Sequence, residues 1–330
     1  MRRIKWGVLG TAYIFERDTA EGMKQAENCG LYAIAGRSME KAQAFKEKYG
    51  FQKAYGSYEE LLSDPEVEAV YIPLPNTLHY EWTLKALKAK KHVLCEKPLA
   101  PTAEEAEKMF KTAREEQVLL MEAFAYQHSP YIAQVQKEIE QGIIGEVRYM
   151  EAALITSDYV EGNIRMRRET LGGSTYDLGV YCSSLILRMT GKEPETIKAV
   201  STFSKEGVDM YTTVLMEYEN GMRASFDCGM VLATEKNSAL DRFQIHGTEG
   251  SIEGVEFGFN ASGELSYRVR TFDGREELKT VAVPQNYRLE VEQLGRCITE
   301  GETPAVSEAF SLANARSIDR ILKCIGYCQR

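Results

Sequence analysis

The 330-residue sequence lacks the features that would place it in several common classes of protein. No apolar run approaches about 18 residues, so we expect no helix that spans a membrane. Lys and Arg number 40 against 49 Asp and Glu, and the net charge of −9 provides no basic field to attract nucleic acid or an acidic membrane. His and Cys form no cluster with zinc-site spacing, so no structural metal is expected.

Cysteine shows no pattern either. The seven cysteines are scattered, and only Cys324 and Cys328 lie close together. An odd, unpatterned count favours reduced thiols over a disulfide framework, which predicts a cytoplasmic protein. The basic residues Arg2 and Arg3 precede only a short apolar run interrupted by glycine, which we interpret as a first strand and not as a signal peptide.

The length and the pattern of strands and helices predict two domains. Strands alternate with helices up to Glu122, which indicates a parallel, doubly wound Rossmann sheet over residues 1–122. From Ile197 on, strands follow one another, with a hairpin signal at Asn220-Gly221. We therefore expect an α/β domain followed, over residues 123–330, by an α+β domain with a large, mainly antiparallel open sheet.

A charged pair ends one of the predicted parallel strands. Val93 to Cys95 is a short apolar run, and Pro98 must stop it because proline cannot donate to a sheet ladder. Glu96 and Lys97 then lie at the carboxyl end of the strand, which faces the ligand crevice in such sheets. Two interpretations stay open: a lysine with a chemical role, or a surface salt bridge.

The first strand leads into a thinned glycine motif. The run Ile4 to Leu9 ends in Gly10-Thr11-Ala12 and is followed by a helical pattern, the layout of a dinucleotide-binding turn. Gly10 holds the first glycine position of that motif, but Ala12 and Phe15 replace the other two. An ordinary turn between a strand and a helix is the alternative.

The end of the second strand bears on the choice of cofactor. An acidic residue there would bind the ribose hydroxyl of NAD, but this chain has Gly36-Arg37-Ser38, with Lys41 one turn on. Arginine and a hydroxyl group suit a 2′-phosphate, so NADP is favoured over NAD unless Arg37 is simply a solvated loop residue. The next strand ends in Pro73-Leu74-Pro75-Asn76, and His79 follows near the start of a predicted helix. His79 is either a cofactor contact or a packed residue.

In this order the motifs resemble those of the glucose–fructose oxidoreductase / inositol dehydrogenase / MocA (Gfo/Idh/MocA) family, along the whole chain. The resemblance implies that Lys97 reaches the nicotinamide ring and the substrate hydroxyl. The thinned glycine motif departs from the family pattern. The cofactor contacts predicted from the strand ends and the resemblance are Gly10, Thr11, Ala12, Tyr13, Ile14, Arg37, Ser38, Lys41, Pro73, Leu74, Asn76, His79, Glu96, Lys97 and Arg165.

The resemblance also selects residues in the second half. Family members carry an aromatic-rich segment that lines the active site after residue 122, so Tyr126 and His128 are candidate substrate contacts, with interdomain packing as the alternative. A basic residue before the double glycine Gly172-Gly173 lies near the cofactor in the family, which selects Arg165 from an arginine run that could also be solvated.

Asp177 and Tyr181 fall on one stripe of a predicted helix, beside its main apolar stripe. Buried, they need partners, and a tyrosine that satisfies a core acceptor is the structural alternative. Many family members read Asp-x-x-x-His here, with the histidine as acid/base. Tyrosine in that place resembles the branch of glucose–fructose oxidoreductase and dimeric dihydrodiol dehydrogenase. That resemblance implies catalysis by Lys97, Tyr181 and Asp177, with Asp177 either orienting the substrate or anchoring Lys97.

The predicted function is an NADP-dependent oxidoreductase. It would transfer a hydride between nicotinamide C4 and a secondary alcohol or carbonyl of a sugar, polyol or cyclic diol. The alternatives are a non-catalytic dinucleotide-binding regulator of the same fold and an NAD-dependent inositol-type dehydrogenase. The family also implies a homodimer, or a dimer of dimers, formed through the open sheet. No nucleic acid or membrane partner is expected.

Overall fold

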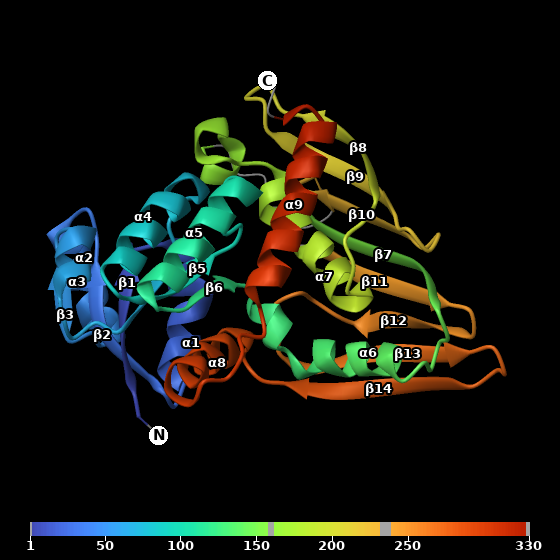
Figure 1. Ribbon diagram of the computed structural model, residues 1–330, viewed down its shortest axis with the longest axis horizontal. Coiled ribbons are helices and arrows are strands. Elements are labelled where there is room, and N and C mark those ends of the chain that lie inside the picture. Colours follow the sequence, from blue (N-terminus) through green and yellow to red (C-terminus); the bar gives the residue numbers. More distant parts are fainter. Residues whose placement is uncertain (1, 158–161, 232–238, 328–330) are drawn as a thin grey trace. The chain divides into compact units, whose positions relative to one another are not determined.

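The computed structural model describes residues 2–157, 162–231 and 239–327 (Figure 1). The chain forms two compact units, each described here by itself. The first unit contains Met1–His128 and Pro284–Leu312, and the second contains Ser129–Val283 and Ala313–Arg330. The boundary expected at residue 122 from the sequence differs from this division chiefly because residues 284–312 return to the first unit.

The first unit is built on a six-stranded parallel sheet, as the sequence predicted. Its strand order is β3-β2-β1-β4-β5-β6, so the order reverses between β1 and β4. Such a reversal marks the ligand crevice of doubly wound sheets. The strands are β1 (Ile4–Leu9), β2 (Cys29–Ala35), β3 (Lys53–Tyr55), β4 (Ala69–Ile72), β5 (His92–Glu96) and β6 (Leu120–Ala123).

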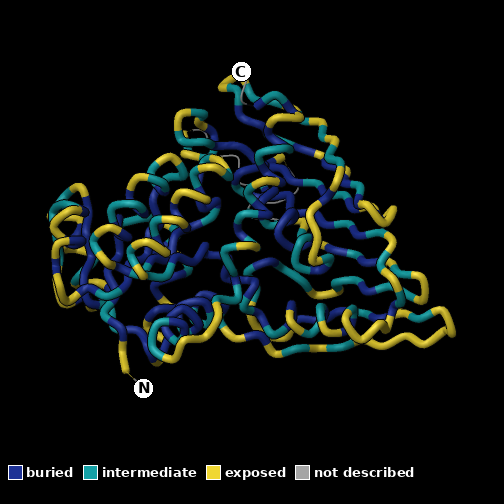
Figure 2. Tube along the Cα trace, viewed as in Figure 1, coloured by how far each residue is buried: buried dark blue, intermediate teal, exposed yellow. Residues whose placement is uncertain are grey.

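β1, β4, β5 and β6 are mostly apolar and almost wholly buried, as expected for the centre of a parallel sheet with helices on both faces (Figure 2). Capping residues set where the helices of this unit begin. The side chains of Ser38, Ser57 and Thr102 precede α2, α3 and α5, and each accepts a hydrogen bond from the backbone amide group three residues later. The helices are α1 (Ala20–Gln25), α2 (Met39–Tyr49), α3 (Tyr58–Ser63), α4 (Asn76–Lys88), α5 (Ala103–Glu116) and α8 (Asn286–Glu300).

Two glycines allow α8 to pack against the first unit. A Cβ atom on Gly22 of α1 would lie 2.7 Å from the backbone nitrogen of Arg288, and one on Gly295 of α8 would clash with the side chain of Asn28. The Asn28 amide also donates to the carbonyl of Glu292 over 2.8 Å. Close approach of these backbones explains why α8 belongs to this unit, a contact between segments 260 residues apart that no sequence pattern indicates.

The second unit contains an eight-stranded sheet in the order β14-β13-β12-β11-β7-β10-β9-β8. Its neighbouring strands are antiparallel except for the parallel pair of β7 and β10, which confirms the predicted mainly antiparallel sheet. The strands are β7 (Val147–Thr156), β8 (Thr196–Phe203), β9 (Asp209–Glu217), β10 (Arg223–Gly229), β11 (Ala239–Gly247), β12 (Gly250–Glu256), β13 (Gly263–Thr271) and β14 (Glu276–Val283).

Helices cover one face of this sheet, namely α6 (Pro130–Glu140), α7 (Val180–Thr190) and the later part of α9 (Glu308–Cys324) (Figure 1). Burial alternates along β9 and β10, so each strand turns one set of side chains toward the helices and the other outward. Among the residues that the structure describes, no helix is long and apolar enough to cross a membrane.

Candidate functional site

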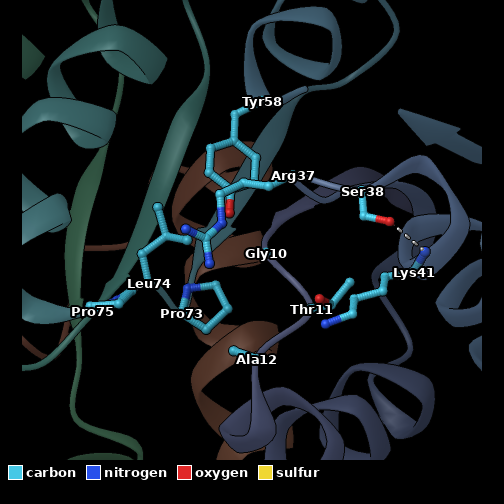
Figure 3. A pocket seen from close by; sticks show the side chains of 10 residues that line it. All are labelled: Gly10, Thr11, Ala12, Arg37, Ser38, Lys41, Tyr58, Pro73, Leu74 and Pro75. Carbon is cyan, nitrogen blue, oxygen red and sulfur yellow. Dashed lines mark hydrogen bonds between the residues drawn. The ribbon is translucent and has the colours of Figure 1, made fainter. Parts of the chain in front are cut away.

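A pocket of about 400 Å³ lies at the point of the first unit where the strand order reverses. Its walls come from the residues that follow β1, β2 and β4, together with one residue each from α2 and α3 (Figure 3). Ten residues line it: Gly10, Thr11, Ala12, Arg37, Ser38, Lys41, Tyr58, Pro73, Leu74 and Pro75. The structure thus brings together eight of the predicted cofactor residues from three separate stretches of sequence.

Gly10 is the glycine that this turn requires. Its φ angle of 111° lies in a region that favours glycine, and a Cβ atom there would stand 3.0 Å from Leu74 Cδ2. The amide group of Gly10 donates to the carbonyl of Ala35 over 2.8 Å, which ties the ends of β1 and β2 together. The turn therefore needs its first glycine, while Ala12 fits at the next motif position.

The pocket is basic. Arg37 and Lys41 both line it, and the described lining residues include no carboxylate. In Figure 3 the Arg37 side chain reaches toward Pro73 and the Lys41 side chain toward Thr11. Two cationic side chains with hydroxyl groups and a glycine turn fit a phosphorylated nucleotide, since charge-assisted bonds to phosphate are strong.

Tyr58 is a lining residue that the sequence reasoning missed. It is buried at the start of α3, where its ring packs edge-on against Trp82, and burial raises its pKa while the charge of Arg37 opposes that rise. The only sequence signal was its place directly after the capping residue Ser57, which predicts a helix start and no contact.

Of the other predicted cofactor residues of this unit, Tyr13, Ile14 and Asn76 lie at the starts of helices beside the pocket-lining turns. Tyr13 is 70% exposed, with Arg17 over its ring at 5.7 Å. These residues do not belong to the wall of the pocket itself.

His79 is completely buried, and both of its ring nitrogens contact backbone carbonyl groups. Its Nδ1 and Nε2 atoms each lie 2.7 Å from a carbonyl oxygen, that of Pro98 and that of Leu74 respectively. Burial lowers the pKa of His79, whereas the two carbonyl oxygens favour protonation of the ring. The imidazole therefore fastens the turn after β4 to the turn after β5, and neither ring nitrogen remains for a cofactor contact.

The strand β5 presents Glu96 and Lys97 as predicted at its carboxyl end, but the pair is not a surface salt bridge. Glu96 is buried and accepts a 2.6 Å hydrogen bond from the Tyr71 hydroxyl, which in turn lies 3.0 Å from Thr19 Oγ1. Burial raises the pKa of Glu96, and the charge of Lys97 opposes the rise. Lys97 itself is half-buried and precedes a cis peptide bond to Pro98.

Two further buried carboxyl groups surround this strand end. Burial raises the pKa of Glu122 to about 7, against a 2.9 Å hydrogen bond from the Leu99 amide group and the charge of Lys97. Glu290 of α8 is 1% exposed, and burial together with the charge of Glu96 raises its pKa well above the usual range. Sequence reasoning missed Glu290 because it arrives with the returning segment.

In the second unit, the turn at Gly172-Gly173 packs against the buried carboxylate of Asp209. Gly173 has a φ angle of 114°, and a Cβ atom there would clash with the carboxylate of Asp209. That carboxylate accepts hydrogen bonds from the Ser174 hydroxyl over 2.8 Å and from the Thr175 amide group over 2.7 Å. The glycine turn and Asp209 thereby fix the start of the helix that carries the predicted catalytic residues.

Arg165 and Asp177 pair with each other, whereas Tyr181 contacts a residue from a later connection. Arg165 Nε bonds to Asp177 Oδ2 over 2.6 Å, so this predicted cofactor residue pairs with a predicted catalytic one. A π-helical turn over Thr175–Gly179 precedes α7, which the 3.6-residue period did not predict. Tyr181 Oη accepts a 3.2 Å hydrogen bond from the amide of Asn260, a residue that sequence reasoning missed.

Of the three predicted substrate residues, which include Asp177, Tyr126 is fully buried and His128 half-buried. Both belong to a 3-10 turn after β6, and the Tyr126 hydroxyl accepts a 2.6 Å hydrogen bond from Gln127. Tyr126 also packs edge-on against Phe124. Among the described residues, no group of His, Cys, Asp and Glu is arranged to hold a metal ion.

Two family models match the chain. The model for the Gfo/Idh/MocA oxidoreductase family, NAD-binding Rossmann fold, matches residues 4–124, and the model for the Gfo/Idh/MocA C-terminal domain matches residues 132–253. D-xylose 1-dehydrogenase (NADP(+)) 2 of Haloferax volcanii is 33% identical over 96% of this chain and 95% of that protein. Trans-1,2-dihydrobenzene-1,2-diol dehydrogenase of Xenopus laevis is 29% identical over 98% of both.

A similar architecture is found among solved structures. The 3-ketoreductase of Actinomadura kijaniata, in complex with NADP and TDP-benzene, superposes with a TM-score of 0.90 at 28% identity, covering 98% of each chain. The same full-length coverage holds for the curated relatives, so the likeness includes both units.

The titration of Glu122 gives a testable pH dependence. Because its folded pKa of about 7 exceeds the usual value, the native state binds more protons than the unfolded state between about pH 4.5 and 7. Its contribution to the free energy of unfolding therefore falls as the pH rises through that window. A Glu122→Gln variant should gain stability relative to the wild type from pH 5 to pH 8, on the order of 1–3 kcal/mol.

Urea unfolding followed by tryptophan fluorescence would measure this effect in the first unit, since both tryptophans, Trp6 and Trp82, belong to it. Glu104→Gln, on the exposed face of α5, is the control and should show no such change. An equal stability difference at both pH values would contradict the assignment.

Proposed function

Because the chain belongs to the Gfo/Idh/MocA oxidoreductase family, we propose that this NAD(P)-dependent enzyme uses NADP to oxidise a secondary alcohol or reduce a carbonyl. The substrate would be a sugar, polyol or cyclic diol. The pocket that contains Arg37 and Lys41 but no described carboxylate is the observation that carries the cofactor preference. The names of the relatives, which include a xylose and a dihydrodiol dehydrogenase, support the substrate class.

The proposed cofactor site follows the pocket. Arg37, Ser38 and Lys41 would bind the 2′-phosphate, and the Gly10 turn with the following helix start would bind the pyrophosphate. The bound nicotinamide supplies or accepts the hydride. The NADP in the A. kijaniata structure and in the name of the H. volcanii enzyme supports this choice.

The proposed proton chemistry assigns separate tasks to Lys97 and Tyr181. A free tyrosine has a pKa of about 10, and a neighbouring cation favours its phenolate form. Lys97 would stabilise negative charge on the reacting oxygen, and Tyr181 would give its proton to a carbonyl or take one from an alcohol. Asp177, whose charge is balanced by Arg165, would orient the substrate through its carboxylate.

The environment of Lys97 supports its role. Burial raises the pKa values of Glu96, Glu122 and Glu290, and the charge of Lys97 opposes this rise at Glu96 and Glu122. The lysine is thus electrostatically coupled to two buried carboxyl groups at the end of its strand. We assign Glu96 the positioning of Lys97 through its bond to Tyr71.

We also propose that the protein is a homodimer formed through the outer face of the eight-stranded sheet. On this face, paired residues run across all eight strands from Leu278 to Lys198, and Val200 beside this row is 77% exposed. No described helix covers the face. Sedimentation equilibrium should give twice the protomer mass of 37.2 kDa, and a single species at the protomer mass would contradict the proposal.

Replacement of Arg37 tests the cofactor assignment. Arg37→Ala should raise the KM for NADPH about 10- to 100-fold and leave that for NADH nearly unchanged, because a charge-assisted bond to phosphate is lost. Lys48→Ala, at the far end of α2, is the control, and it should keep the preference for NADPH. An unchanged ratio of the two KM values in Arg37→Ala would refute the assignment.

Replacement of Tyr181 tests the catalytic role. Tyr181→Phe should bind NADPH as tightly as the wild type but lose about 10²- to 10⁴-fold in kcat, the usual contribution of an acid/base group. Steady-state NADPH oxidation with a panel of aldoses, ketoses, osones and oxidised diols would measure it. Tyr218→Phe, a buried tyrosine whose hydroxyl contacts Met216 Sδ, is the matched control. Undiminished turnover would remove Tyr181 from the mechanism.

A further inference from the structure

The connection between β12 and β13, residues 257–262, brings an amide group to the proposed acid/base residue. Asn260 Nδ2 lies 3.2 Å from Tyr181 Oη, and the neighbouring Phe259 packs its buried ring against that of Tyr181, with the centroids 5.4 Å apart. The two contacts involve different parts of the Tyr181 side chain. Phe259 fixes the plane of the ring, and Asn260 binds its hydroxyl oxygen.

This connection is held in place independently of the tyrosine. The carboxylate of Asp241 on β11 lies against this connection, where burial raises its pKa and the backbone amide group of Phe259 opposes that rise. Gly258 leaves room for that carboxylate, because a Cβ atom there would already lie 3.2 Å from Asp241 Oδ2. Phe257 adds a ring contact to Phe259 at 5.1 Å. The position of Asn260 is therefore set by β11 and by aromatic packing, before any contact with Tyr181.

Among the described residues, the side-chain amide of Asn260 forms a hydrogen bond only with the Tyr181 hydroxyl. Its Oδ1 atom is buried and has no hydrogen-bond partner among the described residues, so the side chain gains its polar contact through Nδ2. A buried amide that leaves one end unsatisfied is costly, and such groups are commonly retained for function. The cost is offset here by a donor directed at the oxygen atom that has to change its protonation state.

A donor to a phenol oxygen has a defined chemical effect. It stabilises the phenolate more than the phenol and so lowers the tyrosine pKa. It also occupies an oxygen lone pair, which directs the hydroxyl hydrogen away from the amide. Both effects assist a tyrosine that must release and recover a proton near neutral pH.

We propose that Asn260 is a positioning residue that orients the Tyr181 hydroxyl and lowers its pKa for proton transfer. The proposal rests on the proposed acid/base function of Tyr181 and deepens it. It assigns to a residue 79 positions later in the sequence the control of the protonation state of the catalytic hydroxyl.

Two variants separate this role from simple packing. Asn260→Leu keeps a similar volume but removes the donor, and it should raise the Tyr181 pKa by about half to one unit and lower kcat about 10-fold. Asn260→Asp keeps the shape but places a carboxylate at the hydroxyl, so it should raise the pKa further. Ser262→Ala, exposed in the same connection, is the control and should change neither quantity.

The Tyr181 pKa is measured by NMR on protein with ¹³C at Cζ of tyrosine, with the resonance assigned by its absence in Tyr181→Phe. The pH profile of kcat should move in the same direction as this pKa, while the KM for NADPH stays within about twofold. A Tyr181 resonance that titrates at the same pH in the wild type and both variants overturns the proposal, even if turnover falls.

The outcome also distinguishes this inference from the proposed function. Full turnover by Tyr181→Phe would show that the tyrosine is not the acid/base group, and the inference would fall with it. An inactive Tyr181→Phe combined with an unchanged pKa in the Asn260 variants would reject the inference alone.

Discussion

The arrangement of the first unit depends on placing one ammonium group at the end of a buried strand. Charge is costly there, and Lys97 is accompanied by carboxyl groups that share the buried environment. The bond from Tyr71 fixes Glu96, and His79 fastens the turn that begins at Pro98. Since both supports come from β4 and α4, the neighbours of β5, the orientation of the lysine is a property of the whole parallel sheet.

In the second unit, hydrogen bonds fix the residue at which the helical segment before α7 begins. Asp209 gathers the hydroxyl and amide groups of Ser174 and Thr175, and Gly173 is the only kind of residue that leaves space for its carboxylate. From this fixed start, Asp177 and Tyr181 follow within two turns. Their side chains then meet Arg165 and Asn260 from two other connections, so each proposed reactive group has a partner of defined chemistry.

Features encoded by short stretches could be predicted from the sequence. Most strands of both sheets, the capping residues Ser57 and Thr102 and the basic residues after β2 are local signals, and the structure contains them, whereas the short β3 was not predicted. The family resemblance, carried by short motifs such as the block around Lys97, was confirmed by the family models. What the sequence could not supply are contacts fixed by tertiary packing. Glu290 and Asn260 come from segments whose own patterns show only a helix and a strand connection, and the inward turn of His79 depends on two carbonyl groups that meet only in the folded sheet.

The return of residues 284–312 to the first unit has a consequence for how the chain is made. The six parallel strands are synthesised long before α8, which is the helix that Gly22 and Asn28 pack against. Until about 300 residues have been synthesised, the nascent nucleotide-binding unit exposes the apolar surface that α8 later covers. Vectorial folding, in which an N-terminal domain is finished first, cannot complete this unit before α8 has been synthesised.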